Sequence, residues 1–65
     1  MIVAKISEEK SNELKGKEYQ NGMLYNPVKD KNKNWIVSLV EAQYLLLEDF
    51  EPIEFEADDN NKNTN

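Results

Sequence analysis

The chain has 65 residues and a net charge of −5, with no cysteine and no histidine, and all eight of its basic residues are lysines. A chain this short forms at most one domain, and folding buries only about 60% of the surface that the unfolded chain exposes. The composition excludes disulfides and thiolate metal sites, and it lacks the side chain that most often serves as general base or transition-metal ligand.

Residues 1–6, MIVAKI, alternate in a way that predicts a half-buried strand. Ser7 is the candidate N-cap of a first helix, and the two acids that follow it suit the positive end of the helix dipole. We expect this helix to run to about Lys15, with Gly16 as its C-terminal stop. Leu14 is its only large apolar residue, so the helix should lie on the surface with few anchors.

A β-hairpin over about residues 23–38 is the next predicted unit. Residues 18–21 read as a connection that ends in the Asn21-Gly22 turn signal. Residues 23–28 and 35–37 favour strands, and the polar residues 29–34 between them favour a turn. Pro27 cannot donate a ladder hydrogen bond, so its strand should lie at an edge or kink there. Trp35, the only tryptophan, is expected to be largely buried against the helix that follows.

That second helix should begin after Ser38, because Ser38 and Glu41 have the spacing of a capping box. The apolar residues between 39 and 47 form a broad face, one side of which should pack on the sheet while another stays exposed or meets a partner. A competing interpretation makes residues 44–47 a buried strand, and periodicity alone leaves 44–50 open between helix and strand.

Pro52 ends any helix, and residues 53–56 alternate as a short last strand with acids facing water. Residues 57–65, ADDNNKNTN, have no large apolar side chain, which predicts a disordered tail. The sequence therefore predicts a small single α+β domain over residues 1–56: an N-terminal strand and helix, a hairpin with a capped helix, and a short C-terminal strand.

The charge is unevenly spread along the chain. Residues 1–33 contain seven lysines and five acids, a net charge of +2, whereas residues 34–65 contain one lysine and eight acids, a net charge of −7. This asymmetry can serve solubility, head-to-tail contact between copies, or docking on a basic partner. An acidic domain repels phosphate, so we expect no nucleic-acid binding. No apolar run reaches the roughly 18 residues of a membrane span, and the N-terminus lacks the pattern of a signal peptide.

Three groups of residues together resemble a family of small uncharacterised proteins of tailed phages and prophages of gut bacteria. They are Tyr25-Asn26-Pro27-Val28, the run from Asp30 through Asn34-Trp35-Ile36-Val37-Ser38 to Glu41, and Pro52-Ile53-Glu54-Phe55. The family pattern is similar to FNPV-QDxxGNWxIS-xEE followed by P-x-I-E-Y, and Lys33 stands where it often has glycine. The resemblance covers about residues 7–56 and implies a phage accessory protein of the host cytoplasm or the virion. It implies no activity.

One set of oxygen-bearing residues has the spacing of a calcium loop. Asp30, Asn32, Asn34, Ser38 and Glu41 occupy positions 1, 3, 5, 9 and 12 of a twelve-residue frame. Against this hypothesis, Trp35 stands where such a loop has glycine, and lysines are interleaved with the two charged ligands. A hairpin turn followed by a capped helix explains the same residues, so we favour no metal site and expect no cofactor.

Nothing in the sequence favours catalysis. The acids around residues 48–51 have no nearby nucleophile, histidine or glycine-rich phosphate loop, and a chain this small offers little room for a pocket. The aromatic residues Trp35, Tyr25 and Tyr44 could form a binding surface, although core packing is the commoner role.

We therefore expect a non-enzymatic phage-type accessory protein that binds a protein partner or a second copy, as a virion or assembly component. The alternative is an acidic inhibitor that mimics nucleic acid and blocks a host enzyme. Candidate partner-binding residues are Tyr44, Leu47, Glu48, Asp49, Glu51, Glu54 and Glu56.

Overall fold

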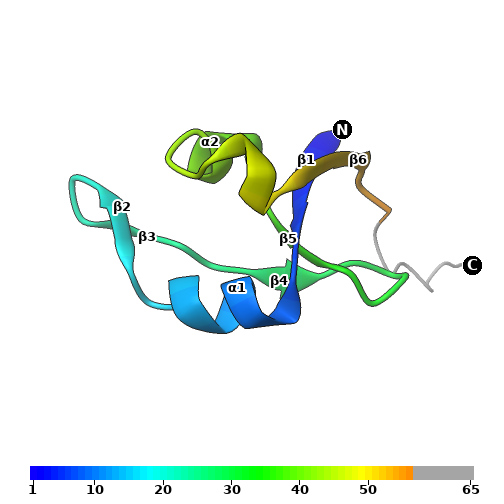
Figure 1. The fold of residues 1–65 in the computed structure, drawn as a ribbon, viewed down its shortest axis with the longest axis horizontal. Helices are drawn as coiled ribbons and strands as arrows, with labels where there is room; N and C mark the ends of the chain where they lie inside the picture. The colour runs from blue at the N-terminus through cyan, green and yellow to red at the C-terminus, as the bar shows by residue number, and fades with distance from the viewer. Residues whose placement is uncertain (57–65) are drawn as a thin grey trace, which may run out of the picture.

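The computed structural model describes residues 1–56 as a small α+β domain (Figure 1). Its main sheet is antiparallel, in the order β4 (Val28–Lys29), β5 (Trp35–Val37), β1 (Ile2–Ile6), β6 (Glu51–Glu54). A second sheet pairs β2 (Glu18–Gln20) with β3 (Met23–Leu24). The helices are α1 (Glu8–Leu14), α2 (Leu39–Ala42) and the 3-10 helix η1 (Leu47–Asp49). The fold class predicted from the sequence is confirmed.

Strand β1 lies in the middle of the main sheet and is more deeply buried than its sequence pattern predicts. Ala4 is fully buried, and Val3 and Ile6 are each 4% exposed. Ala4 and Ile6 belong to the main core, together with Leu14, Tyr25, Val37 and Ala42. Val3 lies on the other face, beside Ile36 and Phe55. Both faces of β1 therefore carry buried side chains.

Trp35 is mostly buried, as expected, but it lies at the edge of the core rather than at its centre. It is partly exposed and packs against the edge of the core, and the Nζ of Lys29 lies 5.2 Å from its ring centroid. The register explains this position: Trp35 is the first residue of β5 and pairs with Ile6, the last residue of β1. Trp35 therefore lies at the end of the ladder between β1 and β5.

Helix α1 has the ends and the thin buried face that its sequence predicts. Ser7 Oγ accepts a hydrogen bond from the Lys10 N–H at 3.0 Å, which confirms the N-cap. The helix ends at Leu14, one residue before the expected end, and Gly16 has the positive φ of +82° that favours glycine after a helix. Only Ser11 and Leu14 are buried.

The sequence predicted one strand over residues 23–28, but the structure has two short strands there. The first of them, β3, pairs with β2, in a segment that was expected to be a connection. Val28, the last residue of the run, is the first residue of β4, which pairs with β5. Asn21 and Gly22 between β2 and β3 have φ of +40° and +82°, as the two central residues of a type I′ hairpin turn require. Pro27 precedes β4, an edge strand of the main sheet, as its missing N–H predicts.

The polar turn between β4 and β5 is confirmed, and Asp30 organises it. One carboxylate oxygen, Oδ1, accepts hydrogen bonds from the N–H groups of Asn32 at 2.9 Å and Asn34 at 2.8 Å. The other, Oδ2, accepts from Asn34 Nδ2 at 3.3 Å. Lys33 has a φ of +68°, in the left-handed region that favours glycine. The turn therefore keeps the glycine-like geometry with a residue that does not favour it.

The capping box of α2 is present, and its glutamate does more than cap the helix. Ser38 Oγ accepts from the Glu41 N–H at 3.2 Å, while Glu41 Oε1 accepts from both the N–H and the Oγ of Ser38 at 2.8 Å. The second carboxylate oxygen of Glu41 accepts from the Asn26 N–H at 2.8 Å. Glu41 is only 8% exposed. A single buried carboxylate thus connects the start of α2 to the chain between β3 and β4.

Residues 44–50 form neither a continued helix nor a strand. Helix α2 ends at Ala42, because the next amides bond to carbonyls three residues back: Tyr44 N–H to Glu41 O and Leu45 N–H to Ala42 O. These tighter turns lead into η1. One small sheet cannot bury every apolar side chain between residues 39 and 47. After the turns, Leu45 packs against the core, whereas Leu46 and Leu47 are exposed.

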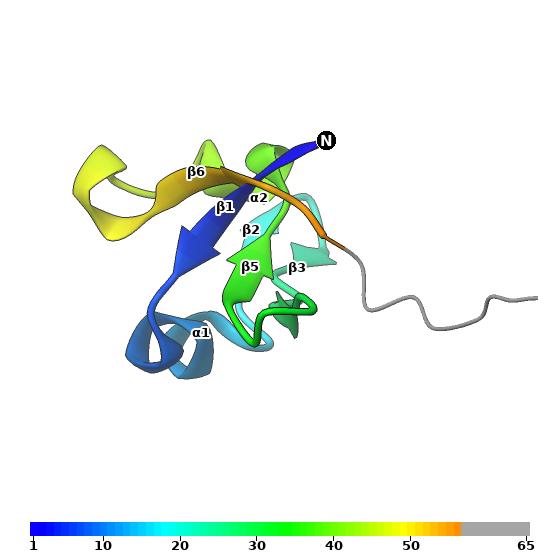
Figure 2. The same ribbon diagram turned by 90° about the vertical axis from the view of Figure 1, so that its right-hand side faces the viewer.

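The last strand, β6, is two residues earlier than expected and contains Pro52, which an edge strand tolerates. After β6, the chain turns towards the β4–β5 turn (Figures 1 and 2). The Phe55 N–H donates to Met1 O at 2.8 Å, and Glu56 O accepts from the Lys31 N–H at 3.0 Å. The tail expected over residues 57–65 lies outside the described residues.

We predict that Glu41→Ala lowers the free energy of unfolding by about 2–3 kcal/mol, because it removes the carboxylate that accepts several partly buried hydrogen bonds, from the N–H of Asn26 and from the N–H and Oγ of Ser38. Ser38→Ala should cost about 1 kcal/mol, the loss of one cap. Urea unfolding of both variants measures the difference, with Glu48→Ala as an exposed control. Equal losses for Glu41→Ala and Ser38→Ala would show that Glu41 acts only as a capping residue.

We predict that Lys33→Gly raises the free energy of unfolding by about 0.5–1 kcal/mol, since relief of a left-handed backbone outweighs the extra entropy of glycine in the unfolded chain. Lys31→Gly in the same turn removes the same charge without a positive φ to relieve, and should be neutral or destabilising. Thermal unfolding of the pair tests this. A gain from Lys31→Gly as large as that from Lys33→Gly would assign the effect to charge.

Candidate interaction surface

Five of the ten large apolar residues that are exposed within residues 1–56 lie in α2 and the turns that follow it; the others lie at the amino terminus and in β3 and β4. Leu47 is 84% exposed, Leu46 63% and Tyr44 48%. Leu39 and Val40 in α2 are also exposed, as is Met23 in β3. Tyr44 and Leu47 were predicted partner-binding residues. The other four were not singled out, although the broad apolar face of residues 39–47 indicated that some of it stays uncovered.

Tyr19 joins the β2–β3 hairpin to the α2 region. Its ring centroid lies 5.1 Å from that of Tyr25 and 5.6 Å from that of Tyr44, with tilted rings in both pairs. The Tyr44 hydroxyl donates to Gln20 Oε1, and Met23 Sδ lies 3.9 Å from both the Tyr19 hydroxyl and Gln20 Nε2. Burial of Tyr25 raises the pKa of its hydroxyl, with a further contribution from the charge of Glu41. These contacts place Met23 next to Tyr44 on one surface.

We call six exposed residues of the β2–β3 hairpin, α2 and the turns after α2 the apolar surface; the contacts above connect two of them, Met23 and Tyr44. Its members are Met23, Leu39, Val40, Tyr44, Leu46 and Leu47. The aromatic residues divide between the two roles considered from the sequence: Tyr25 is a core residue, whereas Tyr44 is half exposed and contributes to this surface.

The predicted acidic residues are exposed, except Asp49, which is partly buried, and several already have partners. Asp49 forms an ion pair with Lys10 at 3.5 Å, Glu54 pairs with the amino terminus, and Glu56 Oε1 accepts from Asn32 Nδ2 at 3.0 Å. Glu48 and Glu51 form no ion pair within residues 1–56. The structure therefore does not present one uniform acidic face.

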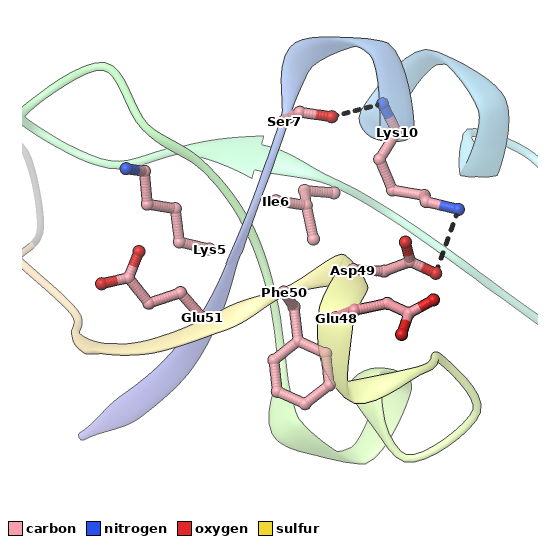
Figure 3. A pocket seen from close by; sticks show the side chains of 8 residues that line it. All are labelled: Lys5, Ile6, Ser7, Lys10, Glu48, Asp49, Phe50 and Glu51. Carbon is pink, nitrogen blue, oxygen red and sulfur yellow. Dashed lines mark hydrogen bonds and ion pairs between the residues drawn. The ribbon is translucent and has the colours of Figure 1, made fainter.

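Lys10 stands at the centre of the charged contacts near η1. It lies 3.3 Å from Glu13 and 3.5 Å from Asp49, and the hydrogen bond to Glu13, with a further contribution from Asp49, raises its pKa. In Figure 3, Lys10 reaches from α1 towards Asp49, and Glu48 extends beside Asp49. Surface pairs of this kind contribute little stability, and this one connects η1 to α1.

Two hollows lie beside these elements. The first has a volume of about 380 Å³ and is open to solvent, with Lys5 and Lys10 on one side and Glu48, Asp49 and Glu51 on the other (Figure 3). Ser7 Oγ in its wall already serves as the N-cap of α1. The second, about 280 Å³, lies between Val3, Ile36 and Phe55, with Ser38 and Glu41 at its border. The polar groups of that border are used within the fold.

The residues of the calcium-loop hypothesis are not gathered around one point. Asp30 precedes β5 and Glu41 follows it, so the two charged ligands lie beyond opposite ends of that strand. Both carboxylates already accept hydrogen bonds from backbone N–H groups. The hydrogen bonds from Asn34 hold the pKa of Asp30 below its usual value. Within residues 1–56, no cluster of three or more acidic side chains is placed to hold a metal ion.

The strand edges offer a partner little backbone to pair with. β6 carries Pro52, which lacks an N–H, between exposed Glu51 and Glu54, and charged residues and proline are common guards of an edge. The other edge, β4, is only two residues long. The main sheet therefore offers little backbone for the addition of a strand.

No protein-family model, curated protein or solved structure matches the chain. None of the helices within residues 1–56 is long and apolar enough to cross a membrane. The chemistry of the surface is therefore the basis on which a function can be inferred.

We predict that millimolar calcium does not shift the melting temperature, because Asp30 and Glu41 already accept N–H groups and lie at opposite ends of β5. A bound cation would stabilise the fold by about 2.7 kcal/mol at a hundredfold excess over its dissociation constant. Thermal unfolding with calcium and with chelator tests this. A calcium-dependent rise that disappears in Glu41→Gln would restore the calcium loop.

Proposed function

We propose that this protein is a non-enzymatic accessory module that binds another protein through the apolar surface. The exposure of Leu46 and Leu47 carries this proposal. A 65-residue domain has few large apolar side chains, and leaving two adjacent leucines 63% and 84% exposed works against its own stability. Contiguous exposed apolar residues on a small soluble domain are typical of a binding surface.

The two leucines are held in place, which supports recognition rather than chance exposure. Leu45, just before them, packs against the core, and the Asp49 N–H donates to Leu46 O at 2.9 Å. The ion pair between Asp49 and Lys10 is a further contact at the other end of this segment. Fixed side chains lose less entropy on binding than flexible ones, so a preorganised surface binds more tightly.

The resemblance to small phage-encoded proteins supports a role as a virion or assembly component in the host cytoplasm or the particle. Binding to another phage protein and self-association are both compatible with that role. A catalytic role has less support, because polar side chains of the larger hollow are already used within the fold. Ser7 Oγ caps α1, and Lys10 pairs with Asp49.

An acidic inhibitor that mimics nucleic acid is the second candidate. Its support is the excess of acids after residue 34, of which Glu48 and Glu51 are exposed and form no ion pair within residues 1–56. It has less support than the first, because Asp49, Glu54 and Glu56 are engaged within the domain. A mimic of phosphate spacing needs several acids free at once.

A photo-crosslinking amino acid at position 47, expressed during phage production, tests the proposal. We predict a crosslink to one protein from position 47, no crosslink from exposed position 9 on α1, and loss of the product in Tyr44→Asn. Co-purification with particles would identify a virion component. Equal crosslinking from both positions would contradict a specific surface, and a basic nucleic-acid enzyme as product would favour the inhibitor.

A further inference from the structure

The smaller hollow, of about 280 Å³, has walls that are mostly apolar. Val3 and Ile36 come from the two inner strands of the main sheet, Val28 comes from the edge strand β4, and Phe55 follows β6. Val28 is 44% exposed, so this wall is accessible from solvent. The hollow shares no lining residue with the apolar surface and is therefore a separate feature of the molecule.

Glu41 lines this hollow, and its charge has no cationic partner within residues 1–56. The carboxylate is 8% exposed and accepts three hydrogen bonds, all from neutral groups of Asn26 and Ser38. Such donors replace the hydration of a carboxylate but leave its negative charge unbalanced. An ionised carboxylate has about four acceptor sites, so about one remains, on the Oε2 atom that accepts only from Asn26.

We propose that the smaller hollow binds a small molecule with an apolar body and a primary ammonium group. The body would pack against Val3, Ile36 and Phe55, and the ammonium would donate to Glu41. At about 30 Å³ for each heavy atom, the hollow holds about nine non-hydrogen atoms, the size of 2-phenylethylamine. Apolar walls with one charged group that orients the ligand are typical of small-molecule sites. This inference does not depend on the proposed function.

The charge of Glu41 selects an ammonium over other polar groups. A ligand carboxylate would meet a like charge, and a purely apolar ligand would cover the remaining acceptor site without replacing its water. An alcohol of the same shape would donate a hydrogen bond, but a hydrogen bond between two ionised groups is stronger. The expected order of affinity is therefore amine, then alcohol, then carboxylate.

Three probes with the same phenyl body test this order: 2-phenylethylamine, 2-phenylethanol and phenylacetate. Amide chemical shifts of the full chain, measured by NMR at about 0.15 M salt, report binding and locate it. We predict that the amine binds at least about fivefold more tightly than the alcohol, and that phenylacetate binds weakest. The largest shifts should occur at Val3, Ile36 and Phe55.

Matched variants separate the hollow from general attraction to an acidic protein. Val28→Phe fills part of the hollow from an exposed strand position, where aromatic residues are well tolerated, and should weaken the amine about fivefold or more. Leu24→Phe makes a similar change at an exposed position of β3 outside the hollow, and should leave binding unchanged. Glu41→Gln keeps the size of the side chain and should remove most of the preference for the amine over the alcohol. Thermal unfolding confirms that each variant is folded.

The probe comparison and Val28→Phe decide the inference even if Glu41→Gln fails to fold. Equal affinities of amine and alcohol would overturn it, because Glu41 would then not select the ligand. So would the absence of amine binding up to about 20 mM, which is weaker than an affinity of about −2.4 kcal/mol. Amine-dependent shifts that centre on Glu48 and Glu51 and persist in Val28→Phe would also overturn it, since they would show attraction to exposed acids.

Discussion

The buried carboxylate of Glu41 is the interaction on which the rest of the structure depends. It accepts hydrogen bonds from the N–H groups of Ser38 and Asn26, each at 2.8 Å, and is 8% exposed. Removing a charged group from water costs free energy unless hydrogen bonds replace its hydration, and these backbone donors do so. The contact connects the end of β5 and the start of α2 to the chain that separates the two hairpins. Within residues 1–56, neither a disulfide nor a long helix links these parts.

The apolar surface is a consequence of this arrangement. Because Glu41 fixes where α2 begins, and because the chain tightens after Ala42, Leu45 packs inward while Leu46 and Leu47 point to solvent. Tyr19 holds the β2–β3 hairpin against the same region through Tyr44. A small domain with one central strand buried on both faces has no further layer with which to cover these side chains. A partner could cover them, and binding would then add the apolar burial that a chain of this length lacks.

Local signals in the sequence predicted local structure well. The caps at Ser7 and Ser38, the Asn21-Gly22 turn and the Asp30 turn each depend on residues within a few positions, and the structure contains all of them. The errors concern pairing between distant residues. Nothing near residues 23–28 indicates that β3 pairs backwards with β2 while β4 pairs forwards with β5. The bond from Asn26 to Glu41 spans fifteen residues, and the capping box alone explained the glutamate. Similarly, periodicity located an apolar excess in 39–47 without showing which side chains remain exposed.

Amide hydrogen exchange measured by NMR tests the role of Glu41 most directly. If the carboxylate connects the two halves of the fold, the N–H groups of Asn26 and Ser38 exchange only when the whole domain unfolds, although both residues are exposed and Asn26 lies outside any helix or strand. In Glu41→Gln, protection of the Asn26 amide should fall far more than that of the β1 amides. Rapid exchange of Asn26 in the unmodified protein, at the rate of an exposed loop, would contradict this interpretation.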